Sequence, residues 1–118
     1  MQLEERIVGN VAIVKVTGEI TLSKGGDVLL KDKIHSLIQQ GHKNLLMDLS
    51  DVTYVDSAGL GQLVQAYATT KNRGGTLKLL NVTKRLRDLL VVTKLLTVFD
   101  TYDSEPAALA SFGAASRA

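Results

Sequence analysis

The residues best suited to chemistry lie together in one short stretch, Val55-Asp56-Ser57-Ala58-Gly59. Ser57 falls where a strand and a loop are expected to lead into a helix, and a serine on such a turn is the nucleophile of hydrolases with the motif G-x-S-x-G. The first glycine of that motif is missing, because Val55 stands in its place. A nucleophilic serine also needs a general base, and His35 and His42 fall in another predicted helix and its exit loop. We therefore expect no hydrolase and no catalytic residue.

Two further kinds of site can be tested against the same region. Gly59-Leu60-Gly61 begins like the dinucleotide motif G-x-G-x-x-G, but Val64 occupies the third glycine position and the glycines fall inside the predicted helix. The carboxylates of Asp48, Asp51 and Asp56 are accompanied neither by a histidine ligand nor by a metal-binding spacing. Roles at strand ends and turns are therefore favoured, and we expect neither a metal nor a cofactor on this chain.

Ser57 can instead accept a group from another enzyme. Either Asp56 or Ser57 can cap the following helix, because a short side-chain oxygen accepts a bond from a free N–H group of the first turn. A phosphate on Ser57 would meet free N–H groups and the positive end of the helix dipole, and would add about −1.5 to −2 charges beside Asp56. A partner surface fitted to a neutral hydroxyl would not tolerate that charge. Phosphorylation could therefore break a complex and leave the domain folded.

The elements that must position these residues follow from the spacing of apolar side chains. Residues 45–49 form an apolar run typical of a strand covered on both faces, residues 50–55 are predicted as a turn region, and from Leu60 the apolar residues recur at the spacing of a helix face. The other predicted segments are strands at 7–8 and 11–16 joined by Gly9-Asn10, a loop over 17–23, a helix ended by Gly41, a strand at 76–80 after Gly74-Gly75, a helix capped by Thr83, a strand at 97–99, and a helix entered at 103–106. The order β-β-α-β-α-β-α-β-α predicts an α/β fold. We expect a mixed, mostly parallel sheet with an N-terminal antiparallel hairpin and about four helices.

Length and composition limit the range of functions. With 118 residues the chain is sufficient for one domain, which we place at residues 1–112, with residues 113–118 expected to form a disordered tail. The chain has no cysteine, so disulfides and thiolate sites are excluded. No apolar run approaches the ~18 residues of a membrane span, and the N-terminal residues lack the apolar core of a signal peptide. We therefore expect a cytoplasmic protein that does not insert into membranes.

The charge pattern argues against a nucleic-acid partner. Fourteen basic and twelve acidic residues give a net charge of +2, spread along the chain. The densest basic cluster, Lys84, Arg85 and Arg87, alternates with leucines and is predicted to be the solvated side of an amphipathic helix. Three Tyr, two Phe and no Trp leave few side chains for stacking on bases. Direct binding of nucleic acid is therefore not expected.

These features together resemble a STAS domain, and in particular a small bacterial anti-sigma factor antagonist. The segments that carry the resemblance are Val16-Thr17-Gly18-Glu19-Ile20, Leu46-Met47-Asp48-Leu49-Ser50-Asp51-Val52, Val55-Asp56-Ser57-Ala58-Gly59-Leu60-Gly61, Gly74-Gly75 and Leu79-Leu80-Asn81-Val82. The signature D-S-x-G-L in this order of strands is specific to the family, and the similarity extends over nearly the whole chain.

The resemblance implies a switch protein that regulates transcription in a stress response. In the family, the serine at the position of Ser57 is phosphorylated by a partner that is both anti-sigma factor and serine kinase, and a phosphatase removes the phosphate. The unphosphorylated antagonist binds the anti-sigma factor and releases the sigma factor. ATP and Mg²⁺ belong to the kinase. The contact surface implied for this chain comprises Glu19, Ile20, Thr21, Ser23, Asp56, Ala58, Gly59 and Leu60.

Two departures from the family pattern matter. Thr21 stands where members often have Asp, and Lys24-Gly25-Gly26 stands where small residues are common, which weakens the transfer of the loop contacts. Ala58 replaces a second serine that is common in the family, so Ser57 is the only hydroxyl of the motif. Two other functions remain open. The chain could be a regulatory subunit of a membrane lipid or anion transporter, or a module that senses a small molecule.

Overall fold

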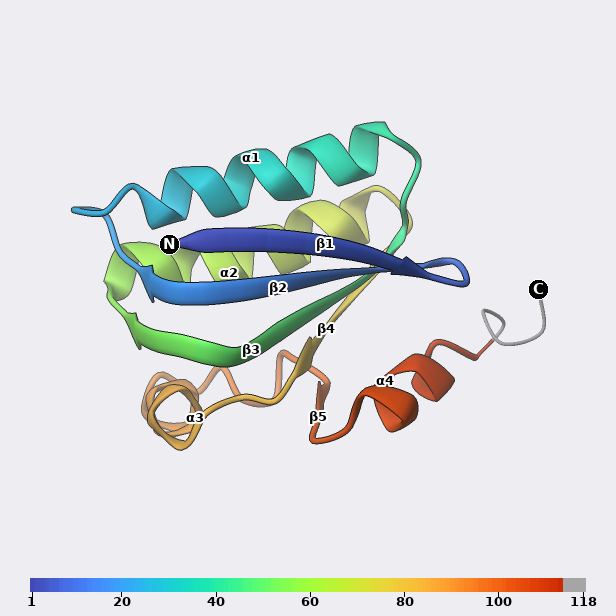
Figure 1. Ribbon diagram of the computed structural model, residues 1–118. Helices are drawn as coiled ribbons and strands as arrows, with labels where there is room; N and C mark the ends of the chain where they lie inside the picture. Colours follow the sequence, from blue (N-terminus) through green and yellow to red (C-terminus); the bar gives the residue numbers. More distant parts are fainter. Residues whose placement is uncertain (114–118) are drawn as a thin grey trace.

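The structure, a computed structural model, describes residues 1–113. Within these residues a five-stranded sheet and four helices follow the predicted order (Figure 1). The elements are β1 (Gln2–Val8), β2 (Val11–Ile20), α1 (Gly26–Gln39), β3 (Asn44–Val55), α2 (Ser57–Asn72), β4 (Thr76–Leu80), α3 (Lys84–Val92), β5 (Thr101–Tyr102) and α4 (Glu105–Ser111). Gly113 is described, and the rest of the predicted tail, 114–118, lies outside the described residues.

The sheet has the strand order β1-β2-β3-β4-β5, so neighbours in the sheet are also neighbours in sequence. β1 and β2 form an antiparallel hairpin, and the remaining pairs are parallel. Parallel neighbours need a crossover between them, and a helix lies between each successive pair from β2 onward. The predicted α/β fold with a mixed, mostly parallel sheet is therefore confirmed.

Both faces of the central strands are covered. Figure 1 places α1 and α2 on one side of the sheet, and α3 and α4 on the other. In the main core, apolar side chains of the strands pack against helix residues such as Ile34 of α1 and Leu63 of α2, which are fully buried. A smaller cluster on the opposite side packs Leu46 and Leu80 against Ala108 of α4. Burial on both faces explains why the first half of β3 reads as an unbroken apolar run.

Two predicted boundaries around the site are wrong. Residues 17–20 were expected in a loop and residues 50–55 in a turn, but both segments continue as strands and pair with each other, ending at Ile20 opposite Val55. Register shifts interrupt this pairing between Lys15 and Thr17 and between Gly18 and Glu19. Such irregularities break the alternation by which a strand is recognised, and the polar, exposed residues of this segment conceal the strand further. α2, in contrast, begins at Ser57, directly after Asp56, which agrees with the expectation that Asp56 or Ser57 caps this helix.

The position of the last strand also differs from the prediction. It was predicted at 97–99, but β5 consists of Thr101 and Tyr102. Phe99 belongs to the hydrophobic core, where it is 4% exposed. The centre of its ring lies 5.5 Å from that of Tyr67, in an edge-on arrangement. The backbone bonds to β4 begin one residue later, where the carbonyl of Asp100 accepts from the amide of Leu79 at 2.9 Å. The apolar residues at 97–99 therefore gave the signal of a strand, although the strand itself begins two residues later.

The C-terminal helix is held to the sheet by a buried lysine. Lys78 of β4 is 8% exposed, and its ammonium group donates to the hydroxyl of Ser111 at 2.9 Å and to the carbonyl of Ser111 at 3.0 Å. The same ammonium lies 4.8 Å from the ring centre of Phe112 and 5.5 Å from that of Tyr102. A buried cation is tolerated only with such partners, so Lys78 fixes the end of α4.

Candidate functional site

Asp56 connects the two segments of the candidate site. It is the N-cap of α2, with an extended backbone, and one carboxylate oxygen accepts from the amide of Gly59 at 2.8 Å. The other oxygen accepts from the amide of Leu22 at 3.0 Å, in the turn after β2. Sequence left open whether Asp56 or Ser57 caps the helix, and the structure assigns the cap to Asp56. One side chain therefore holds the β2–α1 turn against the start of α2.

These bonds also set the charge of Asp56. The amide of Gly59, and after it that of Leu22, lower the pKa of the Asp56 carboxyl below its ordinary value of 3.8. The carboxylate is therefore ionised at neutral pH and already neutralises part of the positive end of the α2 dipole. The N–H groups expected to be free for a phosphate on Ser57 are consequently engaged in part.

Gly59 allows the close approach of α2 to β2. A Cβ atom at this position would lie only 2.0 Å from the carbonyl oxygen of Ile20, the last residue of β2. The amide of Asp56 donates to that same oxygen at 3.3 Å. No side chain fits between the two backbones, so a glycine at position 59 is needed for α2 to pack this closely against the end of β2.

Ser57 is exposed and is the first residue of α2. Its hydroxyl makes no hydrogen bond within residues 1–113. The carboxylate of Asp56 next to it is committed to two backbone amides and is not aimed at the hydroxyl as a base. Ser57 is therefore accessible to another enzyme and poorly equipped to act as a nucleophile itself.

The structure brings together the remaining predicted contact residues but exposes only some of them. Ser23 is exposed, and Glu19 and Ala58 are half-buried. The buried members of the set are Ile20, Thr21, Gly59 and Leu60, with exposures of 0 to 9% where their values are given. Thr21 supports the turn, since its hydroxyl accepts from the amide of Lys24 at 3.3 Å. The buried residues shape this surface rather than touch a partner through their side chains.

Leu22 lies in the loop Glu19 to Ser23, which the family resemblance implies as part of the contact surface, although Leu22 is not among the residues named individually. Its side chain is 67% exposed, although its amide is bonded to Asp56. Leu22 therefore adds exposed apolar surface to the turn that is bonded to the cap of α2. The available signal was a single leucine among polar residues, Thr21-Leu22-Ser23-Lys24, in a segment where no helix or strand period explains it.

The other carboxylates and the histidines do not extend the site. Asp48 accepts from the amide of Ser50 at 3.1 Å, and Asp51 pairs with Lys15 at 3.2 Å. His42 precedes the start of β3, whereas Ser57 follows its end, so the length of the strand separates them. No group of three or more His, Cys, Asp or Glu that could hold a metal occurs among residues 1–113. Over the same residues, no helix is long and apolar enough to cross a membrane.

Comparison with known proteins identifies the family. The five-stranded mixed sheet carries an exposed serine, Ser57, directly after the helix cap Asp56 where β3 meets α2, and these features define the α/β domain. The family model described as STAS domain matches residues 2–108, and this chain belongs to the STAS domain family.

Individual relatives agree with this assignment. The chain is 38% identical over 87 residues to the anti-sigma-B factor antagonist of Bacillus subtilis, covering 74% of this chain and 77% of the relative. An anti-sigma factor antagonist from Mycobacterium paratuberculosis has the same fold, with a TM-score of 0.80, 24% identity, and coverage of 93% of this chain and 92% of that one. The Bacillus cell fate determinant SpoIIAA in its phosphorylated form aligns with a TM-score of 0.68 at 20% identity, over 90% of this chain and 94% of that one. The first two are named as anti-sigma factor antagonists, and the third as a cell fate determinant.

Proposed function

We propose that this protein is an anti-sigma factor antagonist controlled by phosphorylation of Ser57. In the unphosphorylated state it binds an anti-sigma factor, and the sigma factor is released to RNA polymerase. The anti-sigma factor is also the serine kinase that modifies Ser57, with ATP and Mg²⁺ bound to that kinase, and a serine phosphatase reverses the modification. The chain itself carries no cofactor and no catalytic residue, and it acts in the cytoplasm.

The exposure of Ser57 on the first turn of α2 is the observation that carries this proposal. Its hydroxyl is unbonded within residues 1–113, and the motif contains no other hydroxyl. The name of the relative at 38% identity supports an anti-sigma factor as the partner. SpoIIAA, described in both unphosphorylated and phosphorylated forms, has this fold, so the fold is compatible with such a modification.

The proposed contact surface combines a neutral serine with an apolar neighbour. The amide of Leu22 is bonded to Asp56, the residue before Ser57, so the turn that carries Leu22 and Ser23 is tied to the start of α2. A phosphate on Ser57 is repelled by the ionised Asp56, whose bonds to Gly59 and Leu22 keep it in place. The phosphate therefore extends outward, into the space that the partner occupies. Burying a doubly charged group against a surface fitted to a hydroxyl is unfavourable, and the complex dissociates.

Two variants test the charge argument against the purified anti-sigma factor from the same genome. Ser57→Asp is expected to fold normally and to bind about 5- to 150-fold more weakly, the range of typical coupling energies. Ser57→Ala is expected to bind like the wild type and to resist phosphorylation. Thr97→Asp places the same charge on an exposed threonine in another part of the chain and serves as the matched control. Calorimetric titration gives each affinity, and equal affinities for Ser57→Asp and the control would refute the switch.

The same proposal can be tested in the source cells. Peptide mapping by mass spectrometry, in resting and stressed growth, is expected to find a phosphate on Ser57 whose occupancy changes with conditions. Absence of phosphate in every condition, together with recovery of the protein in the membrane fraction, would favour a transporter subunit instead.

A further inference from the structure

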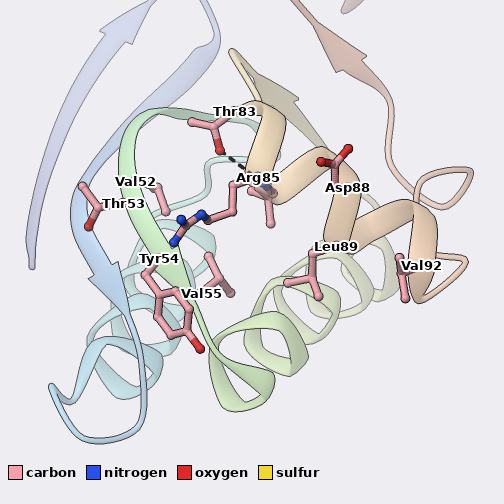
Figure 2. A pocket seen from close by; sticks show the side chains of 10 residues that line it. Val52, Thr53, Tyr54, Val55, Thr83, Arg85, Asp88, Leu89 and Val92 are labelled. Atoms are coloured by element: carbon pink, nitrogen blue, oxygen red, sulfur yellow. Dashed lines mark hydrogen bonds between the residues drawn. The ribbon is translucent and has the colours of Figure 1, made fainter.

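An apolar groove lies between the C-terminal end of β3 and helix α3, with a volume of about 350 Å³ (Figure 2). It exists because β3 continues beyond its pairing with β4, which ends where Asp48 meets Leu80. Beyond that point α3 stands alongside β3 in place of a further strand. The groove is floored by the buried residues Val52, Val55 and Leu86 and walled by Tyr54, Leu89 and Val92.

The walls expose apolar surface that the domain does not use. Tyr54 is 47% exposed and Val92 is 78% exposed. The volume falls at the lower end of the ~300–1,000 Å³ typical of small-molecule sites, which are mostly apolar with a few polar groups that orient the ligand. The groove therefore has the size and lining of a site for one small apolar molecule.

One cation faces this apolar lining. Arg85 extends from α3 toward Val52 and Tyr54 in Figure 2, and it makes no ion pair or hydrogen bond through its side chain within residues 1–113. Asp88, the acidic residue of the groove, points away from Arg85 in the same view and is paired with Lys84 at 3.0 Å. The positive charge of Arg85 is thus available to a ligand, and the negative charge of Asp88 is already balanced.

We propose that the groove binds an amphiphilic monocarboxylate with an unbranched alkyl chain. The carboxylate pairs with the guanidinium of Arg85, a geometry that suits two parallel N–H···O bonds. The alkyl chain lies between Val55 and Leu89 and ends beside Val92. Burial of apolar area drives the binding, and Arg85 sets the orientation and the preference for an anion.

The proposed ligand would lie close to the phosphorylation site. Val55 lines the groove, and the next residue is Asp56, the cap that precedes Ser57. A ligand in the groove therefore contacts the residue directly before the cap of α2. The inference goes beyond the proposed switch function, and binding of the probe is measured on this chain alone.

Sodium decanoate, kept below its micelle-forming concentration, is the probe. Titration of the isotope-labelled protein is followed by backbone amide NMR. We expect saturable shifts confined to residues 52–55 and 85–92. Decanol, which has the same chain without the charge, is expected to bind about three- to tenfold more weakly, in line with the loss of one partly exposed charge pair.

Two variant pairs test the proposed contacts. Arg85→Gln is expected to weaken decanoate about three- to tenfold and to abolish its advantage over decanol, whereas Arg87→Gln on the same helix leaves both unchanged. Val92→Glu is expected to abolish binding, whereas Val91→Glu, an exposed valine outside the groove, does not. Because both valines are exposed, neither change disturbs the core.

Three results would overturn the proposal. The first is the absence of saturable shifts, and the second is equal affinity for decanol and decanoate in the wild type. The third is failure of decanoate to bind while Arg85→Gln or Val92→Glu weakens the complex with the anti-sigma factor. That last outcome would make the groove a protein-docking surface.

Discussion

Replacement of Gly59 by alanine tests whether the motif glycine is required for packing. The added Cβ would lie 2.0 Å from the carbonyl oxygen of Ile20 and 2.9 Å from its carbonyl carbon. Because both atoms belong to the backbone of β2, α2 or the end of β2 must move. Overpacking costs ~1–3 kcal/mol, and a clash with backbone places the cost near ~3 kcal/mol. Alanine regains ~1 kcal/mol of helix propensity, so the expected net loss is ~2 kcal/mol.

Gly61→Ala is the matched control on the same helix. Nothing lies within 4 Å of the Cβ position at Gly61, so this variant should be ~1 kcal/mol more stable than the wild type. The two variants therefore differ by ~3 kcal/mol. Urea unfolding would separate their midpoints by ~1–3 M, given m-values of ~1–3 kcal/mol/M. If Gly59→Ala were stabilised as much as Gly61→Ala, the close contact with Ile20 would not exist.

Three further predictions concern the cap, the core and the C-terminal helix. Because folding lowers the pKa of Asp56, its bonds stabilise the fold fully at pH values above 3.8, the pKa of the unfolded chain, and this stabilisation is lost as the pH falls through the pKa of the folded protein. The amide resonances of Leu22 and Gly59 should therefore shift together over that acidic range and not at higher pH. Leu63→Ala should lower the free energy of unfolding by ~2–5 kcal/mol in urea, because its side chain is fully buried, and a loss under ~1 kcal/mol would mean that it is not. Lys78→Ala should lower the free energy of unfolding by ~1–3 kcal/mol and speed amide hydrogen exchange in α4, while exchange in α2 is unchanged. Equal acceleration in both helices would contradict a local role of Lys78 in holding α4.

Sequence predicted the fold because the central elements are simple. Residues 45–49 of β3 are almost all buried, so their apolar run signals a strand directly, and the spacing after Leu60 signals α2. The second half of β3 gave no such signal, because bulged pairing with β2 and exposure of residues such as Thr53 remove the alternation. The spacing of apolar residues along the sequence identifies regular, evenly buried elements. It does not identify a strand that is maintained only by pairing with a distant segment.

The candidate site was predictable in its chemistry and only partly in its geometry. The residue types around Asp56 and Ser57 limited the possible roles of the serine. The second bond of Asp56, to the amide of Leu22, joins segments 34 residues apart and is invisible to local patterns. The groove beside α3 was equally hidden, because it depends on how far β3 extends past β4. Arg85 was predicted to be a solvated helix residue, and only the fold places it at an apolar groove.

The order of strands in the sheet has a consequence for how the domain forms. Each strand pairs with the one made just before it, so no strand waits for a later one to be inserted between existing neighbours. During synthesis, the β1–β2 hairpin can form first, and each following helix and strand adds to the exposed edge of what is already folded. Sequence separations between partners stay at the length of one crossover, which keeps the loop-closure entropy of each step small. Folding of this domain can therefore proceed from the N-terminus in the same direction as translation.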